Sequence, residues 1–147
     1  ANAGEPLKPL EKVASGGEMS RIMLAMKAMF AKGDAIETLI FDEIDTGISG
    51  RIASVVGEKM VRIARDHQVL CVTHLPQIAA MADAHYLVEK SETDGHARTS
   101  LRALTLQERY VQVAAMMSGA GQSAAALEHA KELVDSCAAA KAEGKIG

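Results

Sequence analysis

Two short apolar runs, each closed by polar residues, restrict the possible folds of this chain more than any other feature. Residues 38–41 stop at Asp42 and Glu43, and residues 69–73 stop at His74. Neither run alternates between apolar and polar side chains, which is typical of strands that are buried on both faces. The stretch between the runs carries apolar residues at helical spacing. A strand, a helix and a second strand in this order predict a parallel pair in an α/β fold.

Other periodic segments extend this pattern on both sides. Helical spacing predicts further helices from Ser15 to Gly33, after Pro76, over 110–117 and over 127–137. Residues 84–90 predict a third strand, and the alternation over 99–103, after the turn signal Asp94-Gly95, predicts a half-exposed edge strand. We therefore expect a mainly parallel sheet with helices on both faces, an edge hairpin and C-terminal helices.

Composition fits a globular protein and excludes several classes of function. The chain has 147 residues, of which 48% are hydrophobic, and its 26 alanines with no tryptophan indicate a core of small side chains. A net charge of −3 argues against a protein that coats nucleic acid by charge alone. No apolar run approaches the roughly 18 residues that span a bilayer, and no signal peptide is visible. Cys71 and Cys137 both read as buried thiols, so we expect a reducing cytoplasm.

The polar residues that close the strands form a candidate site, because ligands of open α/β sheets bind beyond the carboxyl ends of the strands. Asp42 could hold Mg²⁺ through its water shell, and Glu43 could deprotonate an attacking water. His74 could hydrogen-bond a terminal phosphate. An acidic turn and a structural histidine are the alternatives. A zinc site of His67, Cys71 and His74 is disfavoured, because these side chains would point apart.

A second candidate site lies at the start of the first helix. Ser15 and Glu18 are spaced as a capping box, which is a common structural pattern. The glycines between them, Gly16 and Gly17, are unfavourable in a helix unless something must approach its backbone closely. Bare amides and a hydroxyl at a helix N-terminus also suit an anion, with phosphate the expected one. The polar loop over 45–50 could carry contacts across an interface.

Four of these segments, in this order, resemble the second half of an ABC-type ATPase head. They are ASGGE at 14–18 (signature motif), TLIFDE at 38–43 (Walker B), DTGIS at 45–49 (D-loop) and His74 (switch histidine). The residues within these motifs more closely resemble those of the RecN family of bacterial DNA repair proteins, which are relatives of the SMC proteins. This resemblance covers residues 5–90 and continues more loosely to 128–134. Ala14 and the loop after Glu43 differ from the transporter pattern, which disfavours a membrane transporter subunit.

The resemblance implies a role for each residue that matches a motif. The implied roles are contact with the γ-phosphate of ATP on the second protomer (Ser15, Gly16, Gly17), bracing of that turn (Glu18), support of Mg²⁺ (Asp42), catalytic base (Glu43), a bridge between protomers (Asp45) and sensing of the γ-phosphate (His74). It further implies an ATP-dependent homodimer, DNA as a partner of the full-length protein, and a cytoplasmic, nucleoid-associated location.

One part of such a head does not occur in the sequence, namely a P-loop of the form G-x-x-x-x-G-K-S/T. We therefore expect residues 1–147 to be the C-terminal portion of a head, inactive alone and completed by the N-terminal head half of the same protein. Two alternatives stay open. One is a head of another SMC-type chromosome-organising or mismatch-repair ATPase. The other is a non-catalytic dimerisation module, against which Glu43 and His74 argue because packing requires neither.

Overall fold

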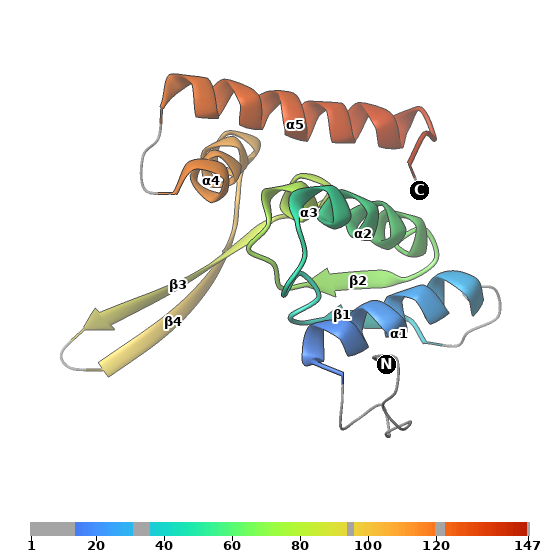
Figure 1. Ribbon diagram of the computed structural model, residues 1–147. Coiled ribbons are helices and arrows are strands. Elements are labelled where there is room, and N and C mark those ends of the chain that lie inside the picture. Colours follow the sequence, from blue (N-terminus) through green and yellow to red (C-terminus); the bar gives the residue numbers. More distant parts are fainter. Residues whose placement is uncertain (1–13, 31–35, 94–95, 120–122, 147) are drawn as a thin grey trace, which may run out of the picture.

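The computed structural model describes residues 14–30, 36–93, 96–119 and 123–146, and it confirms the expected mixed order of helices and strands (Figure 1). The elements are α1 (Gly16–Phe30), β1 (Thr38–Phe41), α2 (Gly50–Ile63), β2 (Gln68–Cys71), α3 (Pro76–Ala80), β3 (Tyr86–Thr93), β4 (His96–Ala103), α4 (Leu106–Ser118) and α5 (Ala124–Ala142). The expected helix end at Gly33 and the turn Asp94-Gly95 lie outside the described residues.

The strands β1 and β2 pair in parallel, as expected, but only one face of the pair is buried. Phe41 lies opposite Cys71 in the register, so the two strands end together. Leu39 and Phe41 point into a core shared with α1 and α2, whereas Ile40 between them is 71% exposed. Leu70 on β2 is also exposed. The prediction of helices on both faces is therefore wrong for the described residues, since the helices that cover this pair, α1, α2 and α3, contribute to the core on the Leu39 face.

The core side of β1 is closed mainly by α2. Ala53, Val56, Met60 and Ile63 fall at intervals of three or four residues along this helix and are all buried. The apolar spacing predicted from the sequence marks this buried side only in part, because Ile52 and Val55, which belong to the same predicted apolar side, are 48% and 50% exposed. Because α2 runs from the end of one strand back to the start of the next, it holds both carboxyl ends at the same edge.

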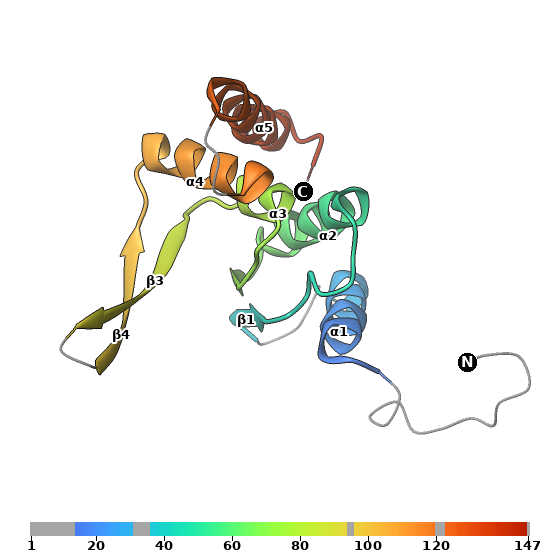
Figure 2. The same cartoon turned by 60° about the vertical axis from the view of Figure 1, so that its left-hand side comes forward.

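The apolar stripe of α1 is not its buried face. Its members are exposed by 39% to 78% of their surface: Met19, Ile22, Met23, Met26 and Met29. The helix instead enters the core through Leu24, which is 3% exposed, with Ala28 one turn further on. Small and medium side chains at this contact let α1 lie close to α2, as Figure 2 shows.

A second core joins α3, α4 and α5. It is built largely from small side chains: Ala79, Ala80, Met81, Tyr110, Val113, Ala114, Ala130, Val134 and Cys137. Arg109 closes the end of α3 by donating to the carbonyl oxygens of Ala80 and Ala82, at 2.7 and 2.5 Å. Cys137 is buried as expected, whereas Cys71 is only partly buried. None of the helices in the described ranges is long and apolar enough to cross a membrane.

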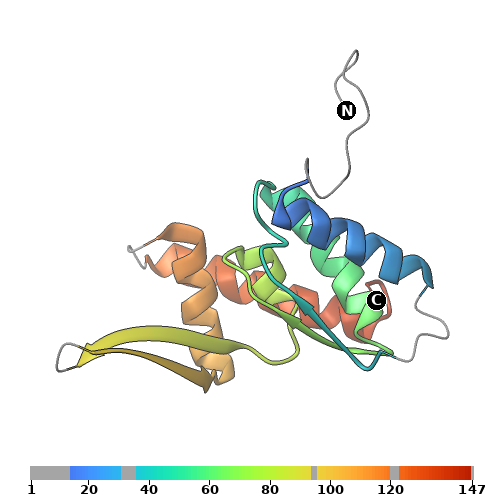
Figure 3. The ribbon, with the colours of Figure 1, turned by 90° about the horizontal axis from the view of Figure 1, so that it is seen from below.

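The third strand does not extend the parallel sheet within the described residues. Instead, β3 pairs antiparallel with β4 from Tyr86 opposite Ala103 to Thr93 opposite His96, in a sheet separate from β1 and β2. The hairpin projects away from the helices (Figures 1 and 3). Pairing with the next strand along the chain closes only a short loop, which is entropically cheaper than a long-range pairing.

Candidate functional site

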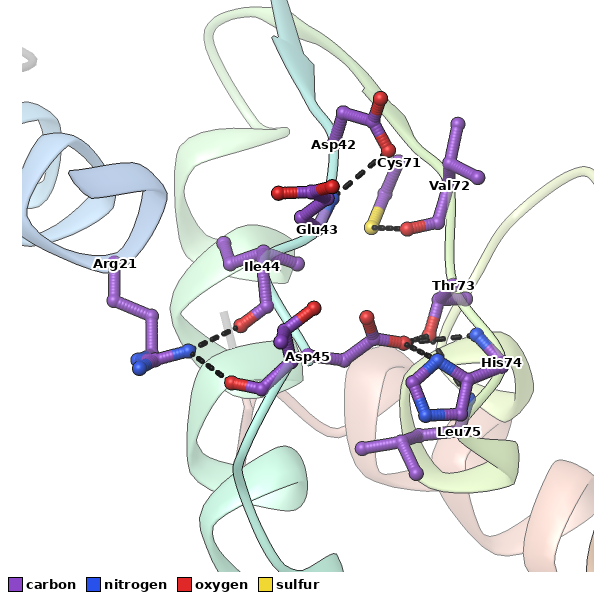
Figure 4. Close-up of polar contacts among 11 residues, drawn as sticks. Arg21, Asp42, Glu43, Ile44, Asp45, Cys71, Val72, Thr73, His74 and Leu75 are labelled. Carbon is purple, nitrogen blue, oxygen red and sulfur yellow. Dashed lines mark hydrogen bonds and ion pairs between the residues drawn. The ribbon is translucent and has the colours of Figure 1, made fainter. Parts of the chain in front are cut away.

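Three segments meet at the carboxyl edge of the β1–β2 pair: the loop after β1, the loop after β2 and the first turns of α1 (Figure 4). The Val72 N–H donates to the Phe41 carbonyl at 3.0 Å, so the parallel pairing continues to the point where the loops begin. Asp42 and Glu43 therefore follow β1 and His74 follows the neighbouring β2 at the same edge, as expected, and their joint role there stays a prediction.

The start of α1 has the capping box expected from its sequence. The Ser15 N–H and hydroxyl donate to Glu18 Oε2 at 2.8 and 3.0 Å, and the Glu18 N–H donates to Ser15 Oγ at 3.3 Å. These bonds, first of all that from the Ser15 backbone, hold the pKa of Glu18 below its usual value. Ser15 and Glu18 thus brace this turn, and whether it also binds phosphate stays a prediction.

The two glycines of this turn allow the loop after β1 to approach α1. A Cβ atom at Gly16 would collide with Glu43 Oε2, and one at Gly17 would lie 2.6 Å from the Glu43 carbonyl oxygen. The expectation that something closely approaches this backbone is therefore met inside the chain, by Glu43 itself. The absence of both side chains lets the glutamate lie directly against the helix N-terminus.

The side chains of the two acidic residues after β1 diverge (Figure 4). The Glu43 N–H donates to Asp42 Oδ1 at 2.9 Å, and both side chains are exposed. Glu43 has a φ of +56°, in the left-handed region that residues other than glycine rarely adopt. This turn of the backbone sends the Glu43 carboxylate toward α1 and the following residue, Ile44, into the core.

Two residues of α1 that sequence reasoning missed hold this loop in place. Ser20 Oγ donates to the Asp42 carbonyl at 2.9 Å. Arg21 Nη1 donates to the carbonyl oxygens of Ile44 and Thr46, at 3.0 and 2.9 Å. The only sequence signal for these contacts is that Ser20 and Arg21 are polar residues in the second turn of a methionine-rich helix. The result is that α1 fixes the loop backbone from Asp42 through Thr46.

Asp45 points into the molecule and binds the loop after β2. It is 3% exposed, and its Oδ2 accepts from Thr73 Oγ1 at 2.6 Å and from the His74 N–H at 2.8 Å. His74 Nδ1 lies 3.1 Å from the same oxygen. Burial raises the pKa of Asp45, but the bonds from Thr73 and His74 outweigh it and the pKa lies below its usual value. The contact seen here is within one chain, unlike the bridge between protomers that the resemblance implies.

The described side chains at this edge do not form a metal-binding cluster of their own. No group of three or more histidine, cysteine or acidic side chains able to hold a metal occurs in the described part of the chain. His67 Nδ1 contacts the Ile36 carbonyl at 2.6 Å, away from His74. Burial, and then the negative charges of Asp45 and Asp42, raise the pKa of Cys71 to about 12, so its thiol stays protonated.

Known proteins with similar sequences share most of this chain. The chain is 51% identical over 134 residues to DNA repair protein RecN of Halalkalibacterium halodurans, which covers 91% of this chain and 24% of that protein. It is 46% identical over 143 residues to the RecN of Bacillus subtilis, which covers 97% of this chain and 25% of that protein. By sequence, the chain belongs to the RecN family. It spans about a quarter of the length of these RecN relatives. No protein-family model matches the chain.

A solved structure supports the fold of this RecN-family chain. It comes from work on ATP-driven dimerization and DNA-stimulated activation of SMC ATPases, and it matches with a TM-score of 0.51 over 81% of this chain and 71% of that chain. The two sequences are 23% identical, so the likeness concerns the fold alone. The expected fold class is thereby confirmed as the fold of this SMC ATPase structure.

Proposed function

We propose that the chain is the C-terminal portion of an ATPase head in a DNA repair protein of the RecN family. The observation that supports this most is the meeting of Asp42, Glu43 and His74 at one sheet edge beside the N-terminus of α1. ATP with Mg²⁺ would bind there between two heads, and turnover would let the heads separate. DNA would be bound by the full-length protein, in the cytoplasm and associated with the nucleoid.

Each residue of the site would have one task in this reaction. Glu43 would accept a proton from the attacking water as it adds to the γ-phosphorus. Asp42 would support Mg²⁺ through water, because its exposed carboxylate keeps one oxygen free of the bond to Glu43. Bound Mg²⁺ neutralises phosphate charge during such a transfer. His74 would contact the γ-phosphate from the other side of the edge.

The start of α1 would serve the second protomer. The Gly16 backbone is exposed and carries no side chain, so the helix N-terminus is open to an anion once Glu43 moves aside. Ser15 and Gly17 belong to the same turn, and Glu18 braces it through the capping box. A γ-phosphate held by one head would then bind the α1 N-terminus of the other, which links ATP binding to dimerisation.

The N-terminal half of the head would cover the open face of the β1–β2 pair. This face presents Ile40, Leu70 and Val72, exposed by 71%, 46% and 63%. Removing such apolar surface from water contributes roughly 25 cal/mol for each Å². The same half would bring the P-loop, whose amides and lysine hold the β-phosphate.

Replacement of the proposed base tests this function. In the longer protein that contains this chain, Glu43→Gln should lower ATP turnover by about 10² to 10⁴-fold, the usual contribution of a general base. Because ATP would persist between the heads, size-exclusion chromatography with light scattering should show a lasting ATP-dependent dimer. Glu58→Gln, an exposed glutamate on α2, is the matched control. Unchanged turnover in Glu43→Gln would reject Glu43 as the base.

A further inference from the structure

A single buried oxygen organises the loop that carries His74. Asp45 Oδ2 lies within hydrogen-bond distance of Thr73 Oγ1, the His74 N–H and His74 Nδ1, at 2.6, 2.8 and 3.1 Å. Asp45 is 3% exposed, whereas the His74 side chain is 73% exposed. The carboxylate is thus fixed inside the molecule and the imidazole extends from it to the surface, as Figure 4 shows.

The chemistry of this contact decides which ring nitrogen of His74 carries the proton. An ionised carboxylate only accepts hydrogen bonds, so an Nδ1 that lies 3.1 Å from it is placed to carry the ring proton. Thr73, which also donates to Asp45 Oδ2, accepts a hydrogen bond at its Oγ1 from the Leu75 N–H at 3.1 Å. These bonds leave the loop little freedom. Nε2 is then the nitrogen that faces outward.

We propose that Asp45 is the positioning residue of His74, holding Nδ1–H inward so that Nε2 is presented at the strand edge. This inference rests on the proposed contact of His74 with the γ-phosphate. It gives Asp45 a task within its own chain, through another residue, where the family resemblance implies a bridge between protomers.

The pairing also matches what a phosphate requires. To donate from Nε2 while Nδ1–H remains on Asp45, the ring must carry a proton on both nitrogens, and it takes the second one from solvent. A carboxylate that orients a histidine from behind is a recurring way to fix the ring and its protonated nitrogen.

A spectroscopic measurement on this chain tests the contact directly. Long-range ¹H–¹⁵N correlation spectra, recorded where the ring is neutral, should show His74 protonated at Nδ1. Asp45→Asn should lose this preference, because a weaker, uncharged acceptor then faces Nδ1. Thr73→Val is the matched control, since it removes another bond to Asp45 Oδ2 without touching the ring, and it should keep the Nδ1–H form. His74 protonated at Nε2 in the unaltered chain would overturn the proposal, without need of any variant.

Turnover in the longer protein tests what the contact does. Asp45→Asn should lower ATP turnover by about 10 to 100-fold, the usual cost of losing such an orienting partner, while ADP affinity stays within about twofold. In a His74→Ala background, the same change should add less than about twofold, because Asp45 would act through His74. A further tenfold loss in that background, or an equal loss of ADP affinity, would show a merely structural role. If the longer protein itself hydrolysed no ATP, the proposed function would fail, whereas the spectra would still decide the Asp45–His74 contact.

Discussion

At the scale of single residues, the sequence predicts the chemistry of the site but not the bonds that hold it. Asp42, Glu43 and His74 were predictable, because each follows a short apolar run and such ends meet in a parallel pair. Arg21 and Thr73 were not, since they bind partners 23 to 28 positions away and leave no periodic pattern. The inward direction of the Asp45 side chain depends on the left-handed backbone of Glu43. Glutamate has no preference for this conformation, so the sequence does not predict it.

Asp45 should make the stability of the chain sensitive to acid. Its pKa in the folded state lies below the ordinary value of 3.8, so the unfolded chain takes up a proton first as the pH falls. The carboxylate therefore contributes stability above pH 3.8 that is lost as the pH falls through its folded pKa. Urea unfolding between about pH 7 and pH 2 should show a shallower acid loss for Asp45→Asn than for the unaltered chain.

The glutamates of the capping boxes should also make the stability of the chain sensitive to acid. Besides Glu18, Glu108 forms such a box with Thr105 at the start of α4. The pKa values of Glu18 and Glu108 also lie below their usual range, first because the backbone N–H groups of Ser15 and Thr105 donate to these carboxylates. Some acid loss should therefore remain in Asp45→Asn. An acid limb as steep as that of the unaltered chain would show that Asp45 is not among the groups responsible.

At the scale of elements, periodicity predicts where helices and strands lie but not which side of each is covered. The bounds of β1 follow directly from the apolar run over 38–41, whereas the spacing of α2 predicts its buried side only in part, since Ile52 and Val55 are exposed. The stripe of Met19 and its neighbours on α1 is exposed, and so is Ile40 on β1. An apolar face of a helix or strand indicates that it packs against something, but the segment that covers it can lie in another part of the protein.

The link between α1 and the loop after β1 should depend on Arg21. Arg21→Met keeps the length of the side chain and removes the donors to the Ile44 and Thr46 carbonyls. We expect a loss of about 1 to 2 kcal/mol in the free energy of unfolding, since the bonds are charged but only partly buried. Denaturant unfolding measures it, with Arg51→Met, at an exposed position of α2, as the control. Equal midpoints for the two variants would contradict a structural link through Arg21.

At the scale of the whole molecule, the proposed function makes this chain one part of a longer protein. It spans about a quarter of the length of its RecN relatives, and its β1–β2 pair is covered on the Leu39 face alone by the described helices. The sequence predicted a head portion from its motifs. It could not predict the open face, because an apolar run does not reveal whether its second partner belongs to the same segment.

Substitutions on the open face of the β1–β2 pair should have different effects in this chain and in the longer protein. Ile40→Ser should change the stability of this chain by less than about 0.5 kcal/mol, as expected for an exposed site, but should destabilise the longer protein by about 1 to 3 kcal/mol. Phe41→Ala, at the buried neighbour, should cost about 3 to 5 kcal/mol in both. Thermal or urea unfolding measures both. An Ile40→Ser effect that is equally small in the longer protein would contradict burial of this face there.

The central claim is that this chain supplies the hydrolytic edge of an ATPase site and needs the rest of the head to bind the nucleotide. Calorimetric titration with ATP and Mg²⁺, of the chain alone and of the chain mixed with the N-terminal head half of the same protein, tests it most directly. We predict no binding in the micromolar range for the chain alone and clear binding in the mixture. Micromolar binding of ATP to the isolated chain would contradict the account.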